Sequence, residues 1–350
     1  MTPKDEVLSA YDLEINDIEI ERIHNGLINS TWRINNSQHN YILQKVNHSI
    51  FKNPQAIASN VRLIADYLQK QFPDYLFVST IKTRDGEEIL NVSDGYFRLS
   101  LFVENSHTID TVEKPEQAYE AAKKFGEFTH LLSAFPVEKL QITLPDFHNL
   151  SLRYQQFLQA LKTGNPARLE ESKELIEFIK EHKNIVDTYE NILHNPAFKL
   201  RVTHHDTKIS NVLFNDENKG LCVIDLDTVM PGYFISDVGD MMRTYLSPVN
   251  EEEKDFSKIT IRDEYFKSIW NGYMRHMKNE LDQEEKRHFI YAGKFMIYMQ
   301  AIRFLTDYLN SDIYYGAKYE GQNFVRAGNQ ITLLQRLIEK ENLLESLIEE

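Results

Sequence analysis

Two short apolar segments in the second half of the chain constrain its fold most strongly. They are VLF at 212–214 and LCVID at 221–225, and the turn-forming sequence NDENKG separates them. Short apolar runs on either side of such a turn predict a β-hairpin. The segment VTHHDTKISN at 202–211 leads into the first strand, and Asp225 and Asp227 stand at the end of the second. The pattern predicts a small hairpin with acidic and amide side chains at its ends.

The chain before residue 105 has the pattern of a β-rich lobe that contains one helix. Its apolar residues Ile57, Val61, Ile64 and Leu68 recur at spacings of four, three and four, which places them on one helical face. The turn signal Asp85-Gly86 separates two of the expected strands. Strand-like segments occupy 20–35, 40–46, 76–82, 87–91 and 96–103.

After about residue 105 the pattern becomes mostly helical. The clearest amphipathic stretches cover 115–133, 262–279, 283–308 and 322–346. We therefore expect an α+β fold of two lobes. Residues 1–104 would form an N-terminal lobe built on an antiparallel sheet, and residues 105–350 a mostly helical C-terminal lobe.

Composition excludes several classes of function. The formal net charge of −14 argues against a non-specific surface for nucleic acid or for anionic membranes. Cys222 is the only cysteine, so the chain has no intrachain disulfide. The N-terminal residues lack the basic start and apolar run of a signal peptide, and no apolar run reaches the ~18 residues of a membrane span. These features predict a cytoplasmic protein.

The segment at 202–214 contains a spacing that suits phosphoryl transfer. His204 and Asp206 are followed, after four intervening residues, by Asn211. Protein kinases use the same order, because an Asp orients the acceptor hydroxyl and a later Asn ligates magnesium. With Asn211, Asp225 would supply the oxygen ligands that Mg²⁺ prefers, and Asp227 would share the metal or accept from a backbone amide. Taken singly, each motif also fits a solvated loop with capping residues.

A family resemblance rests on three segments: HHDTKISNVLF, VIDLDTVMPG and ISDVGDMMR. They resemble the aminoglycoside phosphotransferase and choline kinase superfamily. The branch of the N-acetylhexosamine 1-kinases is the most similar, through GLINSTWRI, YILQKVN, LPDFHN and AIRFLTDYLNSDIYY. The resemblance extends from about residue 20 to 340. It implies a protein-kinase-like fold of two lobes, with ATP as co-substrate and Mg²⁺ as cofactor.

The resemblance implies a role for each residue of the catalytic segments. Asp206 would be the catalytic base, with Asn211 and Asp225 as magnesium ligands. His204 would support the structure of the loop. Further support would come from Asp237 and Asp240, which would accept backbone N–H groups, and from Arg243, which would pair with one of them. Plain helix-capping carboxylates are the alternative interpretation of Asp237 and Asp240.

The nucleotide-binding residues follow from the same resemblance. The hairpin HNGLINSTWRI would cover the phosphates with backbone amides and hydroxyls, through Gly26, Asn29, Ser30 and Thr31. Lys45 would reach the α- and β-phosphates, or else be a surface lysine. The following helix offers no Glu to pair with Lys45, and Asn60 and Asp66 are the nearby substitutes. Adenine would meet the backbone at Phe102, Val103 and Glu104.

The acceptor pocket would lie in the helical lobe. By resemblance Arg303 would donate hydrogen bonds to sugar oxygens and Tyr314 would stack on the ring, with Tyr245 as a further pocket residue. A salt bridge between Arg303 and Asp307 is the alternative. We expect the anomeric hydroxyl of an N-acetylhexosamine as acceptor. The rivals are an aminoglycoside, choline, ethanolamine or homoserine as acceptor, and a non-catalytic nucleotide-binding protein. The sequence leaves open whether the protein is a monomer or a dimer.

Overall fold

The computed structural model describes residues 5–11, 13, 18–23, 28–36 and 39–348 and divides into two compact units. Unit 1 contains Met1–Thr108, Leu131–Pro145 and Asn211–Pro231. Unit 2 contains Ile109–His130, Asp146–Ser210 and Gly232–Glu350. Unit 1 is first interrupted after Thr108, and the sequence had predicted a single boundary at 104–105. The two later segments of unit 1, one of which carries the hairpin of 212–225, were expected in the helical lobe.

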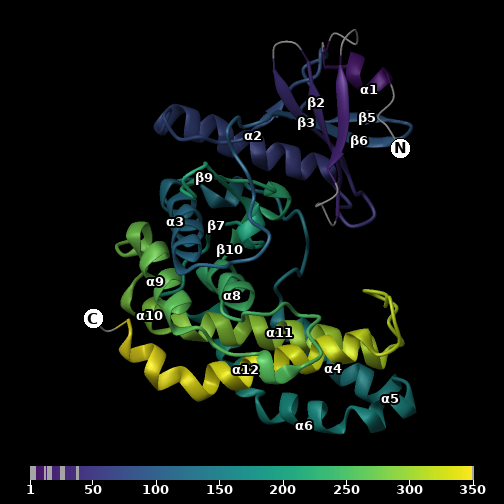
Figure 1. Cartoon of the computed structure of the whole chain (residues 1–350), viewed down its shortest axis with the longest axis vertical. Coiled ribbons are helices and arrows are strands. Elements are labelled where there is room, and N and C mark those ends of the chain that lie inside the picture. The colour runs from purple at the N-terminus through teal and green to yellow at the C-terminus, as the bar shows by residue number, and fades with distance from the viewer. Residues whose placement is uncertain (1–4, 12, 14–17, 24–27, 37–38, 349–350) are drawn as a thin grey trace. The chain divides into compact units, whose positions relative to one another are not determined.

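Unit 1 is built on an antiparallel sheet of six strands (Figure 1). The order along the sheet is β1 (Glu19–Ile23), β2 (Ser30–Asn35), β3 (Asn40–Val46), β6 (Gly95–Leu101) and β4 (Thr80–Ile81), and β5 (Leu90–Val92) also pairs with β6. The turn between β4 and β5 contains Gly86, whose φ of 86° favours glycine. The predicted β-rich character of this part of the chain is confirmed.

The two faces of this sheet differ in chemistry, because successive side chains of a strand point to opposite faces. One face packs against helix α1 (Asp5–Ser9) and forms an apolar cluster that includes Trp32, Leu43, Phe97 and Leu99. The opposite face carries polar side chains on the same three strands, namely Thr31, Gln44 and Arg98.

Helix α2 (Pro54–Gln71) follows the first three strands in the chain. Asn53 caps it by accepting a hydrogen bond from the Ala56 amide, and Pro54 occupies its first turn. The four apolar residues predicted to share one face, Ile57, Val61, Ile64 and Leu68, are all buried. The sequence thus predicted both this helix and the side that it buries.

The predicted hairpin is confirmed as β8 (Val212–Phe214) and β9 (Gly220–Val223), which pair antiparallel. A short 3₁₀ turn, η3 (Leu226–Thr228), follows β9 and packs near α2 within unit 1. Strand β10 (Met230–Gly232) comes next in the chain. The hairpin therefore holds the segment of Asn211 beside the segment of Asp225.

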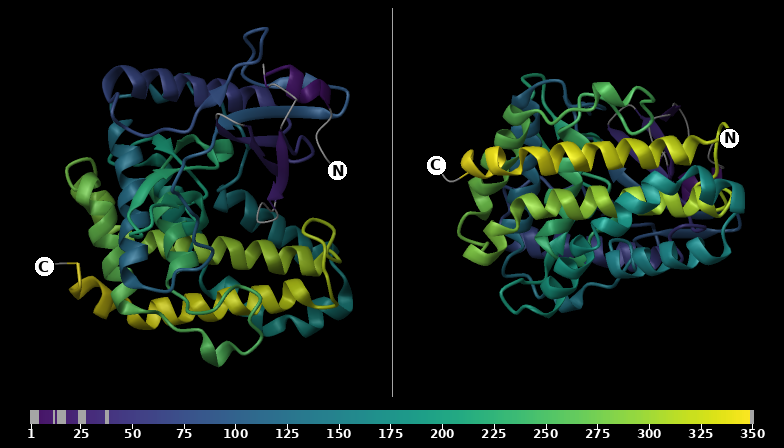
Figure 2. Two further views of the ribbon diagram at one scale, coloured as in Figure 1. Left: turned by 45° about the horizontal axis from the view of Figure 1, so that its top comes forward. Right: turned by 90° about the horizontal axis from the view of Figure 1, so that it is seen from below.

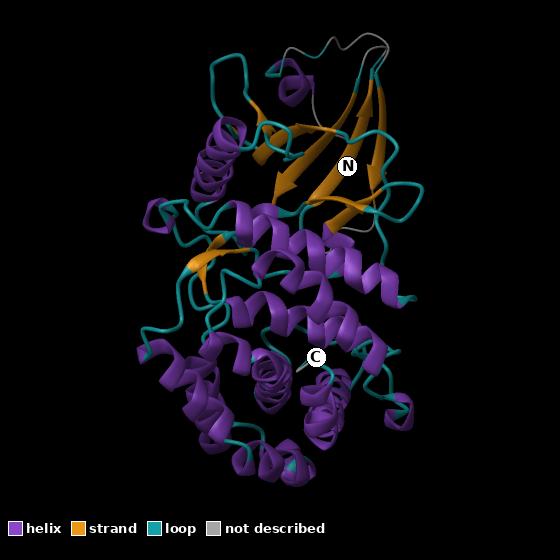
Figure 3. Cartoon of the chain, turned by 90° about the vertical axis from the view of Figure 1, so that its left-hand side faces the viewer, coloured by secondary structure: helices purple, strands orange, loops and turns teal. Residues whose placement is uncertain are grey.

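Unit 2 is mostly helical, as Figure 3 shows in purple. Helix α11 (Phe289–Leu309) is apolar on nearly all sides and packs against α12 (Gln322–Ser346), α8 (Phe234–Tyr245) and α4 (Leu150–Thr163). The views of Figure 2 show α11 and α12 side by side. The other elements are α3 (Pro115–Leu131), α5 (Pro166–Glu171), α6 (Lys173–Glu181), α7 (Asn184–His194), β7 (Arg201–Thr203), α9 (Asp263–Met277) and α10 (Gln283–Arg287).

The helices predicted in the second half match closely, except that 283–308 divides into α10 and α11. Across the described part of the chain, no helix combines the length and the hydropathy that a membrane span requires.

Candidate active site

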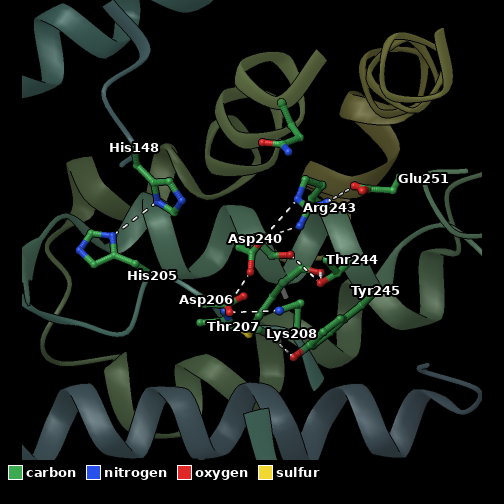
Figure 4. A network of polar contacts seen from close by, with 12 residues as sticks. His148, His205, Asp206, Thr207, Lys208, Asp240, Arg243, Thr244, Tyr245 and Glu251 are labelled. Carbon is green, nitrogen blue, oxygen red and sulfur yellow. Dashed lines mark hydrogen bonds and ion pairs between the residues drawn. The ribbon is translucent and has the colours of Figure 1, made fainter. Parts of the chain in front are cut away.

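The loop after β7 carries Asp206, whose carboxylate is partly exposed in unit 2 (Figure 4). The ammonium of Lys208 lies 3.1 Å from one oxygen of this carboxylate. His205, the residue before it, has a φ of 67°, which is a left-handed backbone conformation. Such a conformation costs energy in a residue with a side chain, so other contacts must hold the loop in place.

Two carboxylates of helix α8 provide these contacts. Asp237 accepts hydrogen bonds from the backbone amides of His204 (3.1 Å) and His205 (2.7 Å). One turn later, Asp240 accepts from the amide of Thr207 at 2.8 Å. Residues three apart lie on the same side of a helix, so one face of α8 binds three backbone amides of the loop. Asp206 is fixed between the amides that these carboxylates bind.

The same carboxylates are buried, and their pKa values reflect it. Burial raises the pKa of Asp237 to about 7, although the hydrogen bonds from His205 and His204 oppose the shift. Burial also raises the pKa of Asp240, and the guanidinium of Arg243 opposes that shift. Arg243 contacts Asp240 at 3.0 Å and Glu251 at 3.1 Å, as Figure 4 shows.

His204 and Tyr245 pack around this loop as supporting side chains. The ring of His204 is buried and meets Phe125 edge-on, with 5.1 Å between the ring centroids. Tyr245 requires a correction, because we expected it to line the acceptor pocket. Its side chain is fully buried, and its hydroxyl donates to the carbonyl of Thr207 at 2.6 Å. Tyr245 therefore stabilises the loop from beneath.

The expected magnesium ligands belong to unit 1. Asn211 is buried just before β8, and its carbonyl accepts from the amide of Ile224 at 2.9 Å. Asp225 is the residue after Ile224. It is exposed and has a φ of 60°, in the left-handed region. Asp227 is buried, and its carboxylate contacts the guanidinium of Arg98 and the side-chain amide of Asn29. The sequence left open whether Asp225 or Asp227 binds the metal ion. In the structure, the carboxylate of Asp227 contacts side chains of this chain.

The expected nucleotide residues are spread over both faces of the sheet in unit 1. Gly26 lies outside the described residues. Asn29 accepts from the amide of Asn47 at 2.9 Å and donates to Asp227 at 2.7 Å. Ser30 and Thr31 begin β2. Lys45 forms an ion pair with Asp94 at 3.1 Å.

Phe102, Val103 and Glu104 follow β6, where adenine was expected. The amide of Phe102 donates to the carbonyl of Asn40 at 2.9 Å, and the carboxylate of Glu104 accepts from the side chain of Asn40 at 2.7 Å. Asn40 thereby ties this connecting segment to the start of β3.

A cavity of about 320 Å³ lies in unit 2 between α4, the end of α11 and the loop after it. Arg303 lines it and donates to the side chain of Gln300 at 3.2 Å. The alternative partner, Asp307, accepts instead from the amides of Tyr314 (2.7 Å) and Tyr315 (2.9 Å). Tyr314 also lines the cavity and is 71% exposed.

Two further residues, one at the cavity and one at the catalytic loop, were not singled out from the sequence. Arg153 on α4 lines the cavity, and burial and then Arg303 lower the pKa of its guanidinium. His148 Nδ1 lies 3.4 Å from His205 Nδ1, beside the catalytic loop. Burial, His205 and then Arg303 lower the pKa of His148, so positive groups surround it. The only signal in the sequence was the place of His148 in LPDFHN.

Solved structures resemble the chain over nearly its whole length. The microcompartment-associated aminopropanol kinase has a TM-score of 0.67 at 14% identity, covering 97% of this chain and 97% of that chain. An aminoglycoside phosphotransferase from Alicyclobacillus acidocaldarius has a TM-score of 0.64 at 12% identity, covering 99% and 97%.

A third structure is that of a spectinomycin phosphotransferase in complex with ADP and spectinomycin. Its TM-score is 0.59 at 12% identity, covering 96% of this chain and 97% of that chain. At these identities the likenesses show the fold, and they confirm the expected kinase-like fold with a sheet region and a helical region.

The model of the phosphotransferase enzyme family matches residues 19–256, which is more than half of the 350 residues. The chain belongs to the phosphotransferase enzyme family and is a small-molecule kinase.

Proposed function

We propose that this kinase transfers the γ-phosphoryl group of ATP to the anomeric hydroxyl of an N-acetylhexosamine, giving the sugar 1-phosphate. The observation that carries the proposal is the lining of the cavity in unit 2. Arg153 and Arg303 line it together with the rings of Tyr314 and Tyr315. Guanidinium groups donate several hydrogen bonds in a fixed geometry, which suits sugar oxygens and an acetamido carbonyl. Tyrosine rings provide apolar faces with a polar end.

The charge of this cavity disfavours the amine acceptors of related kinases. Arg303 lowers the pKa of Arg153, which means that the two guanidinium groups repel each other. The one carboxylate among the lining residues is Asp307, and backbone amides occupy both of its oxygens. A quaternary or protonated amine is recognised by carboxylates or by an aromatic cage without cations. A neutral acceptor avoids this repulsion.

Asp206 would perform the proton chemistry of the reaction. Its carboxylate would accept a hydrogen bond from the acceptor hydroxyl, orient the oxygen towards the γ-phosphorus and receive the proton as the new O–P bond forms. The bond between the γ-phosphorus and the β–γ bridging oxygen breaks, and ADP leaves. Asp237 and Asp240 would keep Asp206 in position, because they bind the amides on either side of it.

Asn211 and Asp225 fit a magnesium site by the chemistry of their oxygens. Mg²⁺ takes one or two side-chain oxygens and completes its shell with phosphates and water. Bound Mg²⁺ would neutralise charge on the transferred phosphates. We propose the cytoplasm as the compartment, since ATP is the co-substrate and the buried Cys222 forms no disulfide.

The test is a panel of acceptors assayed by ADP release. It contains N-acetylhexosamines, other hexoses, aminoglycosides, choline, ethanolamine, aminopropanol and homoserine. We expect the N-acetylhexosamines to give the highest kcat/KM, and phosphorus NMR of the product to show an anomeric phosphate. A higher kcat/KM for an amine would overturn the sugar assignment. ADP release with none of the acceptors would favour the non-catalytic alternative.

Asp206→Asn tests the proposed base with the active acceptor. Loss of a general base costs roughly 10²–10⁴-fold in kcat. Asp216→Asn is the matched control, because it makes the same change at an exposed residue of the hairpin turn. We expect normal turnover from the control and normal ATP affinity from both variants. Near-normal turnover of the folded Asp206 variant would contradict the mechanism.

A further inference from the structure

A row of polar side chains crosses the sheet of unit 1 on the face opposite the apolar cluster. Gln44 on β3 pairs across the sheet with Thr31 on β2 and with Arg98 on β6. Arg98 Nε donates to Gln44 Oε1 at 2.9 Å, and Gln44 Nε2 reaches Thr31 Oγ1 at 3.5 Å. The side chain of Arg98 is 10% exposed, so its positive charge is held close to the sheet.

The guanidinium of Arg98 forms an ion pair with the carboxylate of Asp227. Asp227 follows the proposed magnesium ligand Asp225 by two residues. The other oxygen of Asp227 accepts from Asn29, at the start of β2 where the phosphate-covering hairpin was expected. Arg98 is thus connected, within unit 1, to both segments that we propose to bind the phosphates and their metal ion.

Lys45 has a different position. It pairs across the sheet with Phe97, and residues that pair in this way point to the same face. Phe97 belongs to the apolar cluster that packs on α1. Lys45 Nζ lies 5.6 Å from the centroid of the Phe97 ring and 3.1 Å from Asp94. Its ammonium therefore lies on the face of the sheet that does not carry Arg98.

In protein kinases, a Glu of the helix after β3 pairs with the lysine of β3. Helix α2 contains no Glu. The two candidate substitutes in this helix have other contacts. Asn60 binds backbone groups of Gln141 and Val229, and Asp66 lies 3.5 Å from Arg62. Kinases need a cation at the phosphates and an acidic residue that orients it. In unit 1 the ion pair of Arg98 and Asp227 supplies both the cation and the acidic residue that orients it.

We propose that Arg98, in place of Lys45, contacts the phosphates of ATP in this kinase, with Asp227 and Gln44 as its positioning residues. The inference rests on the ATP-dependent transfer proposed above. A guanidinium has five N–H donors in a planar fork. The contacts to Gln44 and Asp227 engage Nε and Nη1. The fork therefore retains N–H groups that can bind phosphate oxygens while Asp227 fixes its orientation.

Arg98→Met and Lys45→Met form a matched pair for the test, because each replaces a cation by an apolar chain of similar length. Calorimetry would measure the affinity of each variant for ATP and for adenosine, which lacks phosphates. A hydrogen bond to a charged group contributes about 1.5–3 kcal/mol, or roughly 10–150-fold in affinity. We expect Arg98→Met to lose that factor for ATP and to keep its affinity for adenosine. Lys45→Met should bind both ligands like the wild type.

The outcomes separate a phosphate contact from a structural role. Equal losses for ATP and adenosine in Arg98→Met, or a loss for ATP confined to Lys45→Met, would overturn the inference and leave the kinase assignment intact. If Arg98→Met does not fold, Arg98→Lys and Asp227→Asn replace it. Weaker binding of ATP but not of adenosine by either would support the inference, and unchanged ATP affinity in both would overturn it. Failure of the proposed function would appear separately, as a wild-type protein without ATP turnover.

Discussion

Two carboxylates, the half-buried Glu88 in unit 1 and the buried Asp237 in unit 2, are held in different ways. In unit 1, Glu88 accepts from the guanidinium of Arg62 at 2.7 and 2.9 Å and from the hydroxyl of Thr80 at 2.7 Å. In unit 2, both oxygens of Asp237 accept from backbone amides of the catalytic loop. A guanidinium carries a full charge, whereas an amide carries a partial one. The first arrangement neutralises a carboxylate, and the second fixes the course of the backbone.

The pKa values of the two carboxyl groups move in opposite directions. Burial acts to raise the pKa of Glu88, but the hydrogen bonds from Arg62 and Thr80 outweigh it and lower the pKa. Burial raises the pKa of Asp237 to about 7, because the loop amides do not compensate for desolvation. Support for the catalytic loop therefore costs stability at neutral pH. The following changes test this contrast between the units.

The largest effect is expected from Asp240→Ala in unit 2. Asp240 pairs with Arg243 and also accepts from Thr207, so its loss leaves a buried guanidinium and a loop amide without this acceptor. Removing one member of a buried ion pair costs about 3–5 kcal/mol. Denaturant unfolding would measure the free energy of unfolding. Glu170→Ala, in the exposed pair with Lys173, is the control and should lose less than about 1 kcal/mol. Similar losses in both variants would contradict the expected role of burial.

The second prediction concerns the pH dependence that Asp237 confers. Its pKa is raised on folding, so the native state binds more protons than the unfolded state between about pH 4 and pH 7. The stabilisation is complete below the unfolded pKa and is lost as the pH rises through about 7. The change is at most about 1.4 kcal/mol per pH unit. Asp237→Asn lacks the titration, so its stability relative to wild type should rise with pH across this window. Parallel curves for the two proteins would contradict the pKa assigned to Asp237.

The sequence was most informative about features that depend on residues close together in the chain. The spacing of Asp206 and Asn211, the hairpin after them and the buried face of α2 depend on turns and periodicity within a few residues. The hydrogen bonds that Asp237 was expected to accept are also present, but this expectation came from the family resemblance, because the bonded residues are 32 and 33 positions apart. Their functional roles remain predictions.

Partners that are distant in the chain could not be predicted in this way. Asp227 meets Arg98, which is 129 residues away, and only the register of the strands shows that Lys45 and Arg98 lie on opposite faces. Tyr245 is close in sequence to Arg243 but turns inward, because helical position decides which of the two is buried completely. His148 approaches His205 across 57 residues.

The third prediction concerns Glu88 of unit 1, whose charge the guanidinium of Arg62 neutralises. Glu88→Gln keeps the shape of the side chain and removes its charge, so the hydrogen bonds from Arg62 lose their ionic character. Hydrogen bonds to charged groups contribute about 1.5–3 kcal/mol, and the partial exposure of the pair places the expected loss at the lower end. The pKa of Glu88 is lowered on folding, so its stabilisation is present above the unfolded pKa and is lost as the pH falls. An acid titration followed by circular dichroism would show a smaller difference between wild type and Glu88→Gln at low pH.

The smallest effect is expected from the other carboxylate that Arg62 meets. Asp66 lies 3.5 Å from Arg62 at the next turn of α2, and its side chain is 62% exposed. Exposed pairs with this spacing contribute about 0.3–0.5 kcal/mol, because water screens the charges. The free energy of unfolding should therefore fall less than half as much in Asp66→Asn as in Glu88→Gln. Both variants remove a negative charge that faces the guanidinium of Arg62. Asp66 was also a candidate partner for Lys45, but it contacts Arg62 and Lys45 contacts Asp94, so Asp66→Asn should keep its ATP affinity. A marked loss of ATP binding would show that α2 supplies an acidic partner after all, and that burial alone does not rank the carboxylates of unit 1.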